Sequence, residues 1–393
     1  MSLRDEIEAV LRSWNAYEVN KGGSPIIDFD CHPGGPDPEP APDRLTVYRR
    51  LTDLRTRAEG PLAVRLDADL AYLGALLGEH PPLNDYVRAT QGCEPAGWPE
   101  EYLAKRFEQA RAALADLGIT WGADTNTELR QAEGVLDVHE APDAIRQAAD
   151  ELEPAVREAT GSTAPYHLSI ETTEQDAYWA YWLDGAGHDV RLRLNLPNVE
   201  FTQAGARQFA LHEVLGHGLQ SASLTAQAAA EDVPWVRLLS IHAPQQVMLE
   251  GLAQAWPLFL LRDDKVLITR VRLTHYTQLV LAQAHRAINA GTPTLECADY
   301  LKACVPWWKD KTIARYLADR GTSPEHRSYM WAYPAGLDWF AALAEADAKV
   351  CGEVLHAAYR RPLTPADLTE LWPSGPPIGG PGGPVRLRKP PVP

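Results

Sequence analysis

The hexapeptide HEVLGH, residues 212–217, combines two imidazoles with a carboxylate, the side chains that hold a catalytic metal ion and activate water. In the familiar H-E-x-x-H pattern the histidines are four residues apart and share one face of a helix. Here His212 and His217 are five residues apart. Positions five apart in a regular α-helix differ by about 140° around the axis, so the two rings would point to different sides.

A single wide turn with an i→i+5 hydrogen bond would return both rings to one face, and such turns often occur at functional sites. Gly216 is the residue of the hexapeptide that best accepts a distorted backbone. We therefore interpret the spacing as a working variant, with His212 and His217 as metal ligands and Glu213 as general base. The competing interpretation is a chance hexapeptide on a solvated helix, which the apolar flanking residues disfavour.

A third ligand is expected from another helix, and the best candidate is Glu250 in QQVMLEGLAQAW. An unpaired carboxylate in so apolar a segment would be costly to bury. Glu231 and Asp232, on an expected loop, are the competitors. Gln254 lies one turn after Glu250 and is a candidate hydrogen-bond partner for a ligand.

Residues 323–339, SPEHRSYMWAYPAGLDW, present His326, Tyr329 and Tyr333 near an expected helix start. A phenol or imidazolium facing the metal would stabilise the oxyanion of a tetrahedral intermediate. Tyr333 is the first choice for this role and His326 the second, against the alternative of packed aromatic residues. The stretch DFDCHP, residues 28–33, also holds metal-competent side chains, but its spacing fits no known site and it is set aside.

The elements that must position these residues are mainly helical, with one small sheet. The alternation in HDVRLRLNLP predicts a half-buried strand over 188–196, with partner strands in 166–173 and 177–185 and a turn at Asp184-Gly185. The expected organisation is an N-terminal helical region, a metal-binding region and a Pro/Gly-rich mobile tail, over 1–164, 165–370 and 371–393. Later helices are expected over 203–223 (the metal helix), 234–262 (the third-ligand helix), 264–290, 294–319 and 333–347.

Composition and net charge disfavour several classes of function. The 393 residues carry a formal net charge of −16, which disfavours nucleic acid as a partner because such a surface repels phosphate. No run reaches the 18 apolar residues of a membrane span, and the charged start does not resemble a secretory signal. Five scattered cysteines indicate reduced thiols. We expect a cytoplasmic protein without a membrane partner and do not assign its oligomeric state.

HEVLGH is similar to the H-E-x-x-G-H motif of the dipeptidyl-peptidase III family. Over roughly residues 165–345 the chain more closely resembles the bacterial HExxPGH metallopeptidase-like family of gluzincin type. HEVLGHGLQ, LEGLAQAW and YPAGLDWF follow the order of that family's P-G-H-h-x-Q, E-G-W-A and Y-P-G-Q-A-L motifs. The chain departs from the family in lacking the proline before Gly-His and in having a hexapeptide one residue shorter. It also carries Leu252 at the tryptophan position and no glutamine after the later glycine.

The resemblance implies His212, His217 and Glu250 as zinc ligands and Glu213 as general base. It also implies a gluzincin-like architecture, a helical shell around a deep cleft, in which strand 188–196 runs along the cleft and pairs with an extended substrate. The expected activity is zinc-dependent hydrolysis of a peptide or small amide bond, with a short peptide or small molecule as substrate. The alternative is a non-haem iron oxidase or lyase, because two histidines and one carboxylate also bind Fe²⁺.

Overall fold

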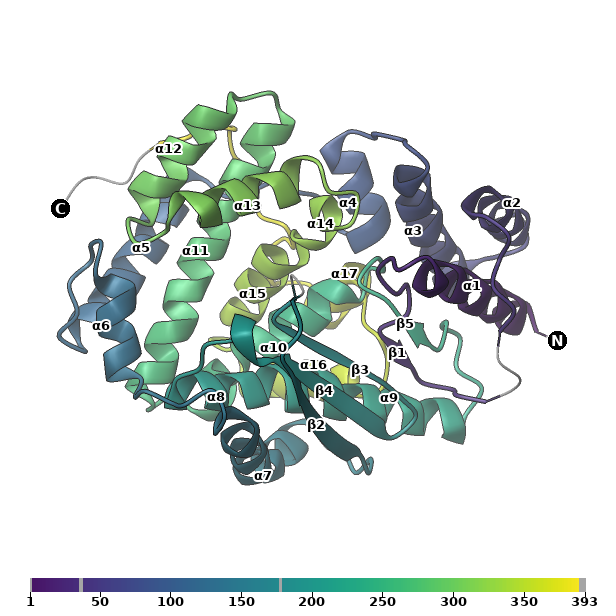
Figure 1. Ribbon diagram of the computed structural model, residues 1–393, viewed down its shortest axis with the longest axis horizontal. Coiled ribbons are helices and arrows are strands. Elements are labelled where there is room, and N and C mark those ends of the chain that lie inside the picture. Colours follow the sequence, from purple (N-terminus) through teal and green to yellow (C-terminus); the bar gives the residue numbers. More distant parts are fainter. Residues whose placement is uncertain (1, 35–37, 177–178, 389–393) are drawn as a thin grey trace.

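The computed structural model describes residues 2–34, 38–176 and 179–388. It is mainly helical with one small mixed sheet, as the sequence predicts (Figure 1). The helices of the N-terminal part are α1 (Leu3–Asn20), α2 (Arg44–Arg55), α3 (Gly60–Leu76), α4 (Leu83–Gln91), α5 (Glu100–Ala115), α6 (Thr125–Ala132) and α7 (Ala141–Thr160). The later helices are α8 (Gln203–Phe209), α9 (Leu219–Ala230), α10 (Gln246–Leu260), α11 (Lys265–Asn289), α12 (Thr294–Cys304), α13 (Asp310–Gly321), α14 (His326–Tyr329), α15 (Ala332–Leu343), α16 (Ala348–Ala358) and α17 (Pro365–Leu371).

The sheet has the strand order β2-β4-β3-β1-β5. Its strands are β1 (Phe29–Asp30), β2 (His167–Thr173), β3 (Tyr181–Ala186), β4 (Asp189–Asn195) and β5 (Leu238–Leu239), and a short 3₁₀ helix, Leu196–Asn198, follows β4. The predicted strand 188–196 is confirmed as β4, with Val190, Leu192 and Leu194 buried as its alternation requires. Of the predicted strand 177–185, residues 177 and 178 lie outside the described residues.

β4 is paired on both sides, whereas part of β3 has a strand partner on one side only. β4 pairs in parallel with β2 on one side and antiparallel with β3 on the other. A substrate therefore cannot add to Asp189–Asn195, and the pairing role expected for strand 188–196 is wrong. β1 pairs with β3 only at Gly185 and Ala186, which leaves Tyr181 to Asp184 unpaired on that side among the described residues.

Three predicted boundaries also differ. The turn lies at Gly187, not at Asp184-Gly185, because Gly187 adopts a positive φ of 64° while Asp184 still pairs with Arg191. The expected helix 234–262 begins only at Gln246, after Leu238–Leu239 has paired with β1. The expected helix 294–319 is split into α12 and α13 around Pro306, since proline disfavours helix in the residue before it.

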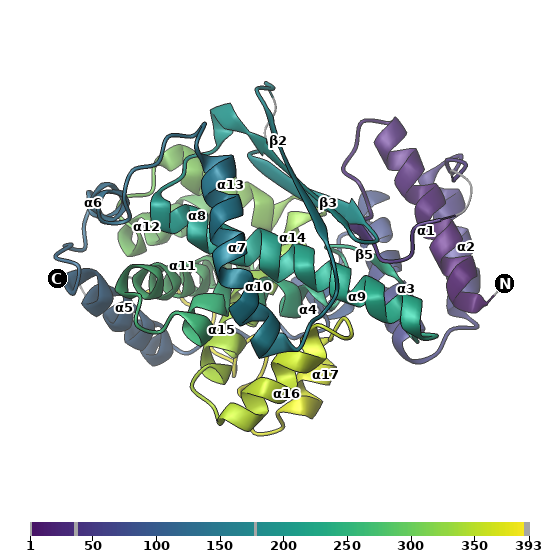
Figure 2. The same cartoon turned by 90° about the horizontal axis from the view of Figure 1, so that it is seen from below.

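The α10 helix lies at the centre of the molecule, and every residue from Gln246 to Pro257 in it is buried. Figures 1 and 2 show α1–α3 gathered at one end of the molecule and α5, α6 and α12 at the other, with α10 and α15 between them. Contacts cross the expected boundary after residue 164, because α5 packs against α11 and α7 packs against the segment that contains the HEVLGH residues. The core therefore combines both halves of the chain around α10.

The C-terminal segment lies against the body of the molecule as far as Arg388. Gln283 donates hydrogen bonds to the carbonyls of Pro384 and Arg386, and Arg388 pairs with Glu100. Among the described residues, the helices are too short or too polar to cross a membrane.

Candidate metal centre

The hexapeptide lies in a π-helical segment, Ala210–Gly218, between α8 and α9. The Leu219 amide donates to the Val214 carbonyl, an i→i+5 bond, so the predicted wide turn is confirmed and the metal helix continues to Ala230. Gly216 does not have a positive φ. Its lack of a side chain matters for space, because a Cβ there would lie 2.8 Å from the Leu211 carbonyl oxygen and 2.9 Å from the Ala253 Cβ.

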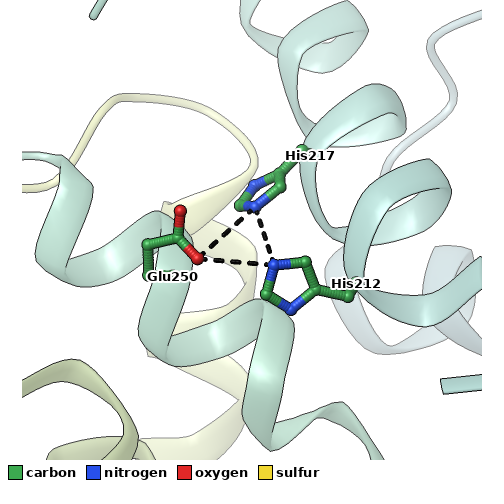
Figure 3. A group of neighbouring side chains, drawn as sticks. All are labelled: His212, His217 and Glu250. Carbon is green, nitrogen blue, oxygen red and sulfur yellow. Dashed lines mark hydrogen bonds and ion pairs between the residues drawn. The ribbon is translucent and has the colours of Figure 1, made fainter. Parts of the chain in front are cut away.

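The wide turn brings His212 and His217 to one side, where Glu250 of α10 meets them (Figure 3). The two Nε2 atoms are 3.2 Å apart, and the Glu250 Oε2 atom lies 3.3 Å from His212 Nε2 and 3.8 Å from His217 Nε2. The three predicted ligands thus converge on one point. Glu231 and Asp232 do not compete, because both are exposed after α9 and Asp232 pairs with Arg4.

The spacing of the three ligand atoms fits a metal ion. Ligands about 2.0–2.1 Å from a tetrahedral zinc ion lie roughly 3.3 Å from one another, close to the three distances between these atoms. Glu250 is buried, yet its Oε2 atom accepts no hydrogen bond from any described residue. A buried carboxylate oxygen needs a partner, and a shared cation would satisfy it together with both imidazoles.

The charged side chains of the site shift one another's pKa values. Burial raises the pKa of Glu250, but the two adjacent imidazoles outweigh it and hold that pKa well below its usual value. Burial lowers the pKa of His217, and contact with Glu250 more than reverses this. Burial raises the pKa of Glu213, and His212 and His217 only partly offset it. Glu213 is buried beside the candidate ligands, where a general base could accept a proton from water.

Two tyrosines extend the site beyond the ligands. The Tyr329 hydroxyl donates to Glu250 Oε1 at 2.5 Å, and the Tyr329 and Tyr333 hydroxyls are 2.6 Å apart. Because Tyr329 uses its only proton on Glu250, Tyr333 must donate to Tyr329 in this arrangement. The bond from Tyr329 fixes Glu250 so that its other oxygen, Oε2, faces the histidines.

Replacing Tyr329 with phenylalanine should weaken metal binding by about 10–100-fold, the usual cost of losing a hydrogen bond that orients a ligand. Competition against a chelator of known affinity would measure the effect. Replacing Tyr333 with phenylalanine is the matched control, since Tyr333 does not contact Glu250 directly, and should leave metal affinity within about threefold. Equal losses in the two variants would show that Tyr329 has no special role in orienting Glu250.

The crossing of α10 and α15 sets the distance between Glu250 and the tyrosines. Gly251 and Gly336 meet there backbone to backbone, and a Cβ on Gly336 would overlap the Val247 carbonyl and lie 2.7 Å from the Gly251 Cα. Gly251 directly follows Glu250 in LEGLAQAW, and Gly336 is the fourth residue of YPAGLDWF. Gly251 and Gly336, 85 positions apart in the chain, thus bring the two motifs together in one close helix contact.

Replacing Gly336 with alanine should cost at least about 2 kcal/mol of stability, because overpacking the crossing outweighs the roughly 1 kcal/mol that alanine gains in a helix. It should also weaken metal binding by moving Glu250. Thermal unfolding and metal titration would test both effects. Gly352→Ala in α16 is the control, because nothing lies within 4 Å of a Cβ there; a neutral Gly336→Ala would contradict the argument.

Two cavities open on either side of the ligands. The first, of about 590 Å³, contains all three ligands, and the second, of about 500 Å³, contains His212. They share the lining residues Ala180, Tyr181, His212, Glu213 and Tyr333. The two cavities therefore adjoin at His212, and Glu213 lines both of them.

The other residues considered in the sequence analysis line the cavities without binding the candidate ligands. His326 lines the first cavity, but its ring approaches Asp319, Ser323 and Glu325 rather than a metal ligand. Gln254, a candidate partner for a ligand, lines the second cavity, and its Oε1 atom has no hydrogen-bond partner among the described residues. Sequence reasoning set aside Asp28, which also lines the first cavity; neither motif spacing nor charge pattern signalled its place there.

Comparisons with known proteins give information on the fold alone. No protein-family model matches the chain, and no curated protein matches it. The chain is similar to a crystal structure of a protein proposed to be a lipoprotein from Colwellia psychrerythraea, with 13% identity and a TM-score of 0.52. The alignment covers 81% of this chain and 59% of the other, so this chain matches little more than half of that protein, and the likeness shows a shared fold alone.

Proposed function

We propose that the protein is a zinc-dependent hydrolase of gluzincin-like type that cleaves a peptide or small amide bond. The observation that carries the proposal is the placement of Glu213. It is buried beside three converging ligand atoms, 3.7 Å from His212 Nε2, and it lines both cavities. An iron oxidase would need the three ligands but has no need of this fourth, basic carboxylate.

His212, His217 and Glu250 would hold the zinc ion, which supplies Lewis acidity that polarises a carbonyl and acidifies water. Glu213 accepts the proton of the attacking water and delivers it to the leaving nitrogen. Burial raises the pKa of Tyr333, so its phenol stays protonated at neutral pH. Turning its hydrogen bond from Tyr329 to the developing oxyanion would stabilise the transition state.

The unpaired side of β3 supports a substrate with an extended backbone. Ala180 and Tyr181 line both cavities, and Trp182 and Leu183 line the first. Unpaired backbone groups on a strand beside a cleft can add a further strand from a ligand, with side chains alternating in and out of the cleft. This geometry favours short, extended peptides over folded proteins.

Digestion of a synthetic peptide library, followed by mass spectrometry, would test the proposal. Zinc-loaded protein should release fragments that gain water, and chelator-treated protein should not. Restoring zinc should restore cleavage. Absence of cleavage by the zinc-loaded protein, together with oxidation of small substrates by an iron-loaded form, would replace the hydrolase with the oxidase alternative.

A further inference from the structure

The α10 helix carries a glutamine one turn before and one turn after the ligand Glu250. Gln246, Glu250 and Gln254 follow one another at intervals of four residues and so share one face of the helix. Gln246 lines the first cavity and Gln254 the second. At 1.5 Å per residue the two glutamines are about 12 Å apart along the axis, the length of roughly four extended residues.

Both glutamines are more than nine-tenths buried, with exposed fractions of 6% for Gln246 and 7% for Gln254. The Gln254 Oε1 atom has no hydrogen-bond partner among the described residues. Gln246 is not among the described buried side chains with an unpartnered polar atom, and it lines the first cavity. Buried carboxamides are costly to leave unpaired. Carboxamides that project into a cavity on either side of a metal centre are suited to the amide groups of a bound chain.

The two cavities differ in the pairing of their charged side chains. The first holds Asp28 and Glu325 beyond the ligands, with Arg315 and His326 also in its lining. In the second, the cations Arg270 and Arg130 are already paired with Glu133 and Glu200. Among the described residues, Asp28 of the first cavity forms no salt bridge, whereas both arginines of the second cavity are paired with glutamates.

The surroundings of Asp28 disfavour its ionised carboxylate. Desolvation raises the pKa of Asp28 to about 7, the nearby carboxylates Glu325 and Glu250 add to this, and the Ile241 amide and Arg65 oppose it. A bound ammonium group would offset these causes. A carboxyl group that is unfavourable in the free fold and lines the cleft is typical of a binding site.

From these observations we infer that the cleft binds an extended peptide of at least about four residues across the metal centre. Its free amino terminus lies toward Asp28 and Glu325, and Gln246 and Gln254 hold its backbone amides on the two sides of the scissile bond. The inference rests on the proposed peptide hydrolysis and adds the direction and minimum length of the substrate. The protein would accordingly cleave short peptides near their amino terminus.

Calorimetric titration of the zinc-loaded Glu213→Gln protein with pentaalanine and N-acetyl-pentaalanine would test it, because this variant should bind without turnover. The free peptide is expected to bind about 10-fold more tightly or better, since a charged hydrogen-bonded contact is lost on acetylation. Adding Asp28→Asn should reduce the difference, and adding Glu325→Gln as well should make the two affinities equal. Equal affinities in the parent, or no binding of either peptide, would overturn the inference; library cleavage tests the hydrolase separately.

Gln245, which precedes Gln246 in the chain, provides a matched control for substitutions of Gln246 and Gln254. Gln246→Leu and Gln254→Leu should each weaken binding of both peptides by about 3–10-fold, the value of one neutral hydrogen bond. Gln245 is equally buried at 6% exposed, but it bonds to the Ser240 carbonyl outside the two cavities, so Gln245→Leu should leave affinity unchanged. A loss in Gln245→Leu equal to the other two would mean that these substitutions act through folding, and would contradict the proposed contacts.

The pH dependence of stability offers an independent check on Asp28. Since its pKa is higher in the folded protein than in the unfolded chain, its ionisation destabilises the fold as pH rises from about 4 to about 7. Asp28→Asn should therefore raise Tm by roughly 2 °C or more at pH 8 and leave it unchanged at pH 4. A lower Tm at pH 8 would assign Asp28 a structural role instead.

Discussion

The Glu213→Gln protein is expected to keep its metal and to lose about 10²–10⁴-fold in kcat, the usual contribution of a general base. The amide is nearly isosteric with the carboxylate but cannot accept a proton from water at neutral pH. Glu213 lies beside the ligands, with its Oε1 atom 3.7 Å from His212 Nε2, without belonging to the converging set. Metal content and steady-state kinetics on a cleaved peptide would measure the two effects side by side.

The same variant separates hydrolysis from oxidation. Under iron chemistry, water activation by Glu213 is not required, and the glutamine variant would retain most of its turnover. Loss of metal together with activity would instead mean that Glu213 shapes the site, which would remove the argument for its role as base. Only retained metal with lost turnover agrees with the proposed mechanism.

Replacing Glu250 with glutamine should weaken zinc affinity by at least about 100-fold, more than the loss of an orienting hydrogen bond does. Glu250 supplies the only negative charge among the three converging ligand atoms. A neutral amide is a poorer ligand for a divalent cation, and it would leave the Tyr329 hydroxyl with a weaker acceptor. Competition for zinc against a chelating dye would give the ratio of affinities.

Glu353→Gln is a suitable control for this substitution, because Glu353 is a surface residue of α16 that contacts Lys349. It changes net charge by the same amount without touching the site, so zinc affinity should stay within about twofold of the parent. Unchanged affinity in Glu250→Gln itself would show that the third ligand has been misassigned.

The ligand set could be predicted from the sequence because its signals are local. The spacing of His212 and His217 conflicts with the α-helical period, and an added residue beside a glycine is enough to predict the wide turn found in Ala210–Gly218. Glu250 stands out because a lone carboxylate in an apolar helix needs a partner. Neither inference depends on how distant elements pack.

The remaining parts of the site depend on packing that no local pattern encodes. Tyr329 ends α14 and reaches Glu250 beside the close crossing of α10 and α15 at Gly251 and Gly336. The cleft-facing strand is β3, since β2 occupies the other side of β4, and strand order cannot be read from alternation. Asp28 enters the cleft because β1 joins the sheet beside β3, a pairing across more than 150 residues.

The most direct test of the central claim is elemental analysis of protein purified without a metal-affinity step, beside a His217→Ala variant. The account predicts about one zinc ion per chain in the parent and almost none in the variant, since two remaining ligands hold zinc poorly. An equal zinc content in both proteins, or no metal in either, would contradict the convergence of His212, His217 and Glu250 on a metal ion.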